Sequence, residues 1–358
     1  MKRHLVYIIN ILFSFILLSC TSQSTVSTNN RYIDFPQVQE LKAKTIQLDT
    51  ALFRYPFRIH ASDNKAVVLD LHGTDHFFHA FSYPEFHYLS SFGKRGDSPE
   101  EMLSAENFRW SGKDLWTLDA NKSELTELEF ALFGDTLLRQ EVVKLDKEIL
   151  RALDFVVYED STFIIPDYTG DNRFCQVSSE GKLLRKFGTI PSANEEALEN
   201  SRPALAQAWR SFIDYNPRKG VLVAATQLGE VLEIYDLKDS THIVCVGPHG
   251  EPEFQVAEGY GIPTGIMGFG DVQVTDNAIY AVFQGKTFKD IMESTKQGNK
   301  LSDGGQSIYV FSLKGEPLRK YVLDRYVHGL FVDEQKGIVI ATDVNKDEPI
   351  IEYSINCM

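Results

Sequence analysis

Cysteine is scarce in this chain of 358 residues, which contains only four. One of them, Cys20, directly follows an N-terminal apolar run. The other three, Cys175, Cys245 and Cys357, are odd in number and show no C-x-x-C spacing, so a disulfide framework is not expected. Cys175 and Cys245 lie inside apolar runs typical of strands, which favours small buried core residues. A single native disulfide is the alternative.

The sequence is also poor in positive charge and lacks the common catalytic motifs. It carries 36 Lys and Arg against 50 Asp and Glu, a formal net charge of -14. This excess of acid disfavours binding to nucleic acid and to anionic lipid headgroups. There is no Gly-rich phosphate loop, nucleophile elbow or H-E-x-x-H motif. These absences leave no motif that would assign the chain to an enzyme class.

The N-terminal apolar run covers residues 5–18, and 14 residues fall short of the about 20 that a membrane-spanning helix needs. It follows two basic residues and predicts a signal peptide over residues 1–19. The ending L-L-S-C resembles the bacterial lipobox, so we expect cleavage before Cys20 and lipid on its thiol. The residue after Cys20 is Thr21 and not Asp. An Asp at this position would resemble an inner-membrane retention signal, so the outer membrane is favoured. The predicted location is the cell envelope, lipid-anchored in the outer membrane and facing the periplasm.

The segment after Cys20 is polar and poor in apolar side chains, which predicts a flexible tether over residues 20–34. Removal of the signal peptide takes away two basic residues, Lys2 and Arg3, and changes the net charge from -14 to -16. The remaining residues, 35–358, are ample for a large folded domain.

Long helical periodicity is almost absent, whereas runs with a period of two recur between turns rich in Gly, Asn, Asp and Pro. The chain is therefore expected to be all-β. Six first strands begin near residues 57, 108, 153, 212, 271 and 329, at spacings of 45–59 residues. Units of this length with four strands each predict a six-bladed β-propeller over residues 35–358. The last unit has three strands, and residues 44–48 form a spare one, so we expect this N-terminal strand to close the last blade.

Two stretches resemble a known family. They are FGKRGDSPEEM at residues 92–102 and GFGDVQVTDNAIYAVFQGK at residues 268–286. The chain is similar through them to the TolB-like six-bladed propellers found as bacterial lipoproteins, which are related to NHL-repeat propellers. The resemblance covers about residues 35–356. It implies a fold, and it carries no general catalytic signature.

Long loops are expected on one face of such a ring. In a propeller, the loops between blades and those between the second and third strands of a blade share a face. The four long loops, 94–107, 190–210, 247–268 and 285–306, are all of these two kinds. Short amphipathic helices are predicted at residues 288–296 and 194–209. This face is therefore the expected binding face.

Charged residues at or near the first strand of each unit are candidates for the central channel or a ligand face. They are Arg58, His60, Arg109, Asp154, Asp214, Asp271 and His328. Aspartate with histidine could hold a divalent cation, for which Asp271 and His328 are the weak candidates. The simpler interpretation is that these groups bind ordered water in the channel.

Two functions remain open at this point. The favoured one is a non-catalytic binding or scaffold module, held to the membrane by lipid on Cys20 and contacting another envelope protein, peptide or glycan, but no nucleic acid. The alternative is a metal-dependent NHL-like hydrolase or lyase of the lactonase type, with its site at the channel mouth. No cofactor is predicted beyond the divalent cation that this alternative needs, and no catalytic residue can be named.

Overall fold

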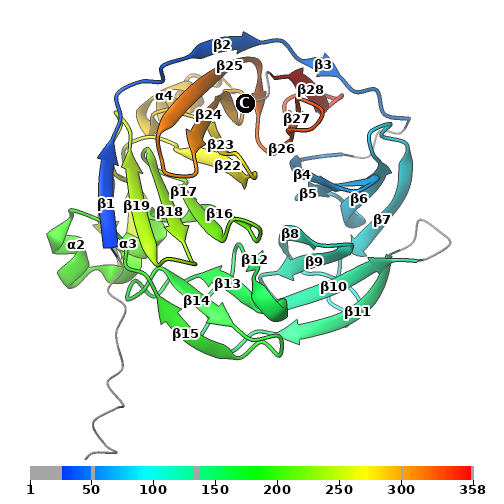
Figure 1. Ribbon diagram of the computed structural model, residues 1–358, viewed down its shortest axis with the longest axis horizontal. Coiled ribbons are helices and arrows are strands. Elements are labelled where there is room, and N and C mark those ends of the chain that lie inside the picture. Colours follow the sequence, from blue (N-terminus) through cyan, green and yellow to red (C-terminus); the bar gives the residue numbers. More distant parts are fainter. Residues whose placement is uncertain (1–25, 50–52, 132–136, 300, 356–358) are drawn as a thin grey trace, which may run out of the picture.

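Six sheets surround a central axis in the computed structural model, which describes residues 26–49, 53–131, 137–299 and 301–355 (Figure 1). Each sheet has four sequential antiparallel strands, except that the last takes its outer strand from the N-terminal segment. The fourth and fifth sheets gain a fifth, parallel strand from the same segment. The predicted six-bladed β-propeller is confirmed. The inner strands begin within three residues of the six predicted positions.

The first three blades follow one another along the chain. Blade 1 has β4 (Pro56–Ser62), β5 (Lys65–Asp70), β6 (His76–Ser82) and β7 (Tyr88–Lys94). Blade 2 has β8 (Ala105–Ser111), β9 (Asp114–Asp119), β10 (Glu124–Phe130) and β11 (Leu137–Lys144). Blade 3 has β12 (Val156–Val157), the 3-10 turn η1 (Glu159–Ser161), β13 (Phe163–Pro166), β14 (Phe174–Val177) and β15 (Leu183–Phe187).

The other three blades each include part of the N-terminal segment. Blade 4 has β16 (Ser211–Asn216), β17 (Val221–Thr226), β18 (Val231–Asp236) and β19 (Thr241–Val246). Blade 5 has β22 (Phe269–Val274), β23 (Ala278–Phe283), β24 (Gly305–Ser312) and β25 (Pro317–Val327). Blade 6 has β26 (Leu330–Asp333), β27 (Ile338–Thr342), β28 (Ile350–Ser354) and, as its outer strand, β3 (Lys44–Thr45).

The core lies between neighbouring blades. The second strands are apolar on both faces, and all six residues of β17 are buried, because each blade packs between two others. Ile59 of blade 1 and Phe331 of blade 6 belong to one buried cluster, which closes the ring. Cys175 and Cys245 are buried and unbonded, as the core interpretation requires. Cys357 lies outside the described residues.

The N-terminal segment wraps around the outside of three blades as a strap (Figure 1). Strand β1 (Val26–Arg31) pairs parallel to β19, and β2 (Val38–Leu41) pairs parallel to β25. Strand β3 pairs antiparallel to β28. Between β1 and β2, Tyr32 and Phe35 pack into the core of blades 4 and 5.

The prediction of a flexible tether over residues 20–34 is therefore wrong for residues 26–34. The polar side chains of that segment suggested no packing, but its backbone pairs with a strand edge that blade 4 leaves open. Residues 20–25, with Cys20, lie outside the described residues. So does the predicted signal peptide.

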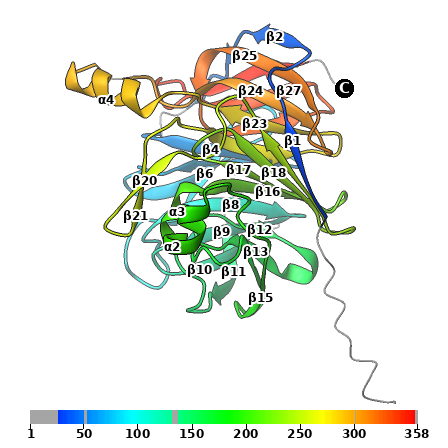
Figure 2. The same ribbon diagram turned by 90° about the vertical axis from the view of Figure 1, so that its left-hand side faces the viewer.

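The inserted elements lie on one side of the ring (Figure 2). They are α2 (Glu195–Asn200), α3 (Arg202–Ala208), the hairpin of β20 (Phe254–Ala257) and β21 (Tyr260–Pro263), and α4 (Phe288–Lys296). The Gln207 side chain of α3 accepts a hydrogen bond from Gly261 N at 3.2 Å, so these insertions support one another. Among the described residues, no helix is long and apolar enough to cross a membrane.

Candidate functional site

The first strand of each blade lies along the central channel. Its backbone edge nearest the axis has no neighbouring strand to pair with. Carboxylates of the preceding blade satisfy part of that edge. Asp154 Oδ2 accepts from Ile213 N at 3.0 Å, Asp214 Oδ2 from Val274 N at 2.7 Å, and Asp271 Oδ2 from Leu330 N at 3.0 Å. Because an unpaired buried N–H is costly, these three bonds join blades 3 to 4, 4 to 5 and 5 to 6 at the axis.

Two buried arginines neutralise most of this acid. Arg58 Nη1 lies 3.1 Å from Asp271 Oδ1, and Arg109 Nη2 lies 3.0 Å from Asp154 Oδ1. Arg109 Nε also donates to Phe155 O at 3.0 Å. Such pairs cost desolvation and are strongly destabilising when one partner is removed. Five side chains near the first strands therefore form hydrogen bonds or ion pairs between blades, namely those of Arg58, Arg109, Asp154, Asp214 and Asp271.

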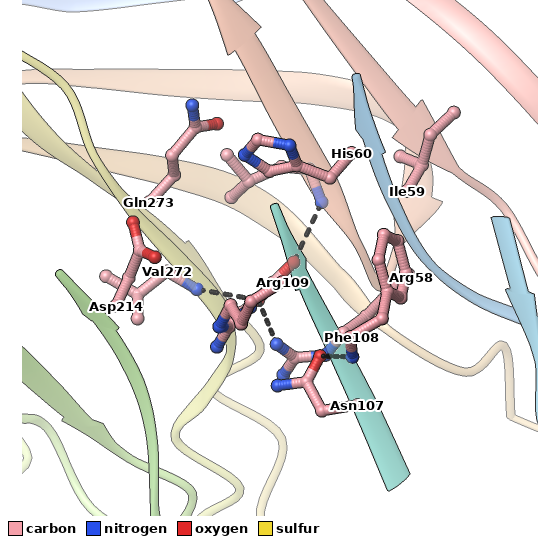
Figure 3. A pocket seen from close by; sticks show the side chains of 11 residues that line it. Arg58, Ile59, His60, Asn107, Phe108, Arg109, Asp214, Val272 and Gln273 are labelled. Carbon is pink, nitrogen blue, oxygen red and sulfur yellow. Dashed lines mark hydrogen bonds and ion pairs between the residues drawn. The ribbon is translucent and has the colours of Figure 1, made fainter. Parts of the chain in front are cut away.

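The channel is closed at this level. The void between these side chains has a volume of about 10 Å³, room for about one water molecule (Figure 3). Of the residues singled out in the sequence, this void is lined by Arg58, His60, Arg109, Asp214 and Asp271. Asp154 is buried behind Arg109.

Three channel groups have a shifted pKa, and burial raises that of Asp271 above its usual value against the attraction of Arg58. Burial raises the pKa of Asp214 from 3.8 to about 6, against the opposing attraction of Arg109. Burial, together with the charge of Arg109, lowers the pKa of His60 to about 4, so its imidazole is neutral at pH 7. His60 Nδ1 has no hydrogen-bond partner in the described part of the chain.

His328 belongs to a separate cluster at the long-loop end of the channel. Its Nε2 lies 3.0 Å from Asp303 Oδ1 and 3.1 Å from the Tyr55 hydroxyl, which also donates to Asp303 Oδ2 at 2.5 Å. The bond to His328 is the main cause that holds the pKa of Asp303 well below its usual range.

The two weak metal candidates are engaged in different places. Asp271 accepts from two backbone amides and pairs with Arg58, while His328 is held by Asp303. Within the ranges that the structure describes, no group of three or more His, Cys, Asp or Glu side chains could hold a metal ion.

The other end of the channel opens into a funnel of about 890 Å³ on the short-turn face. His60, Arg109 and Asp214 line both the funnel and the void, so they form its floor. Five blades contribute aromatic side chains to its wall, namely Tyr83, Trp110, Tyr158, Tyr215 and Phe331.

The sequence analysis missed this funnel, although a signal was present. Trp110, Tyr158 and Tyr215 lie at or just after the ends of their first strands. An aromatic residue repeated at that point of three units indicates a common location at the short-turn end. The long loops made the opposite face the expected binding face.

The long-loop face carries exposed apolar side chains. Tyr260 and Met292 are 59% and 57% exposed, and Val256, Ile262 and Leu301 are also exposed. They come from the β20–β21 hairpin, from α4 and from the loop after it. No residue of α4 is fully buried, although Phe288 and Ile291 are half-buried.

These features define a six-bladed propeller with a closed channel, a polar funnel at one end and an apolar insertion face at the other. The sequence profile of the TolB-like 6-blade propeller-like family matches residues 34–335, and the chain belongs to that family. No protein of curated function matches the chain.

Solved structures share the fold at low sequence identity. A putative exported protein from Bacteroides fragilis superposes with a TM-score of 0.57 and 10% identity, covering 94% of this chain and 100% of that one. A member of the DUF4221 family from Bacteroides vulgatus gives a TM-score of 0.51 at 10% identity, covering 90% and 97%. At this identity the likeness establishes the fold alone.

Proposed function

We propose that this propeller is a lipid-anchored, non-catalytic binding module of the cell envelope, which presents its long-loop face to another envelope protein. The exposed apolar side chains of the β20–β21 hairpin and α4 carry the proposal. Large apolar groups gathered on inserted elements, away from the core, are typical of protein interaction sites. The description of the Bacteroides fragilis neighbour as exported is consistent with this location.

The strap supports this orientation. Strand β1 is parallel to β19, with Val26 opposite Thr241 and Arg31 opposite Val246, so its first residue lies at the short-turn face. Five residues separate Cys20 from Val26, and the six residue steps between the two span at most about 20 Å when extended. A lipid on Cys20 would keep the short-turn side of blade 4 near the membrane. The long-loop face then points away from it, towards other proteins.

The enzyme alternative has no comparable support. The residues that would have held its metal ion form bonds within the protein, and the channel between them has room for about one water molecule.

Anchoring is tested by fractionation. Wild-type protein should partition with membranes and incorporate an alkyne-labelled fatty acid, whereas Cys20→Ala should be soluble and unlabelled. Retention of Cys20→Ala in the membrane fraction would refute the lipid anchor without touching the argument about the face.

The binding face is tested with a photo-crosslinking amino acid placed at Tyr260. The matched control is Leu138 on the outer strand β11, whose side chain is 49% exposed. We expect a discrete, protease-sensitive adduct from position 260, none from 138, and loss of the adduct when Met292→Glu is added. The adducted protein, once identified and purified, should bind the wild type more tightly than Met292→Glu. Equal adducts at both positions, or a protease-resistant glycan adduct, would contradict a protein partner.

A further inference from the structure

The funnel on the short-turn face has the dimensions of a ligand site. Its volume of about 890 Å³ is within the range of small-molecule pockets. The side chains at its floor leave only the void of about 10 Å³ beyond them, so a ligand would enter and leave by the same mouth. The long-loop face plays no part in it, because the funnel is lined by the first strands, by the short turns that follow them and by Tyr83 of the β6–β7 turn.

The funnel wall offers unused hydrogen-bond donors. Trp110 Nε1 is a donor only, and it is buried without a partner among the described residues. His60 Nδ1 is likewise buried without a partner at the floor, and it is a donor in one tautomer of the neutral ring and an acceptor in the other. Buried donors of this kind normally find an acceptor, since an unsatisfied one costs about 1–3 kcal/mol.

The same wall offers carboxylates without an ion pair, one of which, Asp214, already accepts a hydrogen bond from Val274 N. Asp214 and Glu159 line the funnel and form no ion pair with the described part of the chain. The funnel's own cations are already paired, since Arg218 Nη2 lies 2.7 Å from Asp276 Oδ2 and Lys336 Nζ lies 2.9 Å from Asp333 Oδ2. Arg109 at the floor is paired as well, with Asp154, so an anionic ligand would meet unpaired carboxylates and no unpaired cation among the described residues of the funnel.

Apolar surface completes the wall. The aromatic side chains of five blades surround the mouth, and Trp110 is backed by Phe130, with the two rings stacked at an interplanar angle of 12°. A rigid, supported ring of this kind can cover the C–H face of a ligand and keep water from it. A simple cation would satisfy the carboxylates but would leave the N–H donors unpaired.

We propose that the funnel binds an uncharged, polyhydroxylated ligand, that is, a neutral saccharide, with Trp110 as its platform. Each hydroxyl both donates and accepts, so a sugar satisfies the N–H groups and the carboxylates together. The sugar's C–H faces cover the aromatic rings. This site is independent of the protein partner proposed for the opposite face.

Tryptophan fluorescence of the full chain reports on this site directly. Of the three tryptophans, Trp116 is 4% exposed and Trp209 is fully buried, whereas Trp110 is partly exposed in the funnel. Titration would use maltotriose, cellotriose, mannotriose and tri-N-acetylchitotriose, with trigalacturonate as the anionic arm and spermidine as the cationic arm. We expect at least one neutral trisaccharide to change the fluorescence saturably and the two charged probes to leave it unchanged.

Variants then locate the binding by calorimetry with the trisaccharide that binds. Trp110→Ala should weaken binding tenfold or more. Trp110→Phe keeps a ring but lacks the N–H, and should weaken it roughly twofold to tenfold. Tyr260→Ala, on the opposite face, should bind as the wild type does. The proposal is overturned if no neutral trisaccharide binds, if a charged probe binds in its place, or if both Trp110 variants bind normally while folded by circular dichroism.

Discussion

Asp214 gives the sharpest test of the channel electrostatics, through the substitution Asp214→Asn. Its carboxyl accepts from Val274 N at 2.7 Å, and an amide oxygen can accept the same bond. The charged groups around it are Arg109 of β8, Asp271 of β22 with its partner Arg58 of β4, and Asp154 next to β12, while His60 is neutral at pH 7. The substitution therefore removes one buried negative charge and leaves the two arginine pairs in place.

The expected magnitude follows from the pKa. Burial raises the pKa of Asp214 from 3.8 to about 6, and each unit of that rise corresponds to about 1.4 kcal/mol. The folded state keeps its proton at higher pH than the unfolded state, so this group lowers stability progressively as the pH rises from about 4 to about 6. The full penalty, at most about 3 kcal/mol, is present above pH 6. Water in the funnel reduces it.

The assay is urea unfolding of wild type and Asp214→Asn at several values between pH 4 and pH 8. The two proteins should have similar stability near pH 4. At pH 7 to 8 the variant should be more stable, by about 1–3 kcal/mol. Subtracting the two profiles cancels the contributions of all other titrating groups. A variant that is less stable than the wild type at pH 8, or a difference that does not change with pH, would refute the reasoning.

Two further predictions concern packing and buried charge. Phe35→Ala should lower the free energy of unfolding by about 3–5 kcal/mol, because Phe35 is buried against two aromatic rings of blade 5, whereas its neighbour Ile33, 89% exposed, should tolerate alanine within about 0.5 kcal/mol. Equal effects of the two in urea unfolding would show that the strap does not pack. Arg173→Met should cost about 3–5 kcal/mol, since it removes the guanidinium that neutralises the buried Glu233 carboxylate and leaves it only Tyr235 and His242, whereas Arg202→Met removes an exposed pair and should cost under about 1 kcal/mol. Thermal unfolding of both variants would test this, and a mild effect of Arg173→Met would contradict it.

Much of the fold could be predicted from the sequence because each blade has its own local pattern. The alternation of the strands, the buried second strands and the spacing of the units are all local properties, as is the helix at residues 288–296. Strands β1 and β2 could not be found in this way. The sequence VSTNNR of β1 has no apolar alternation, and it becomes a strand only because β19 offers it an open edge.

The site could be predicted only in part, because local sequence patterns do not record contacts between blades. Counting strands placed Arg58, Arg109 and Asp271 near the channel, but it could not say that the first and last of these are paired across the ring, in blades 1 and 5. That contact depends on how far each blade is rotated about the axis, which no local pattern records. Asp271 and His328 were considered together because both lie near first strands. The structure shows that they occupy different levels of the channel.

The strap also has a consequence for the order of folding. Val26 pairs with Thr241, and Thr45 pairs with Ile351, so these contacts join residues 215 and 306 positions apart. Closing such long loops is slow, and it is impossible before the partner strand has emerged. The first residues of the folded domain to be synthesised are therefore the last to find their places. A chain that ends early has no β28 for β3 to join, and the ring stays open. The last blade is therefore complete only after β28 has been synthesised and β3 has paired with it.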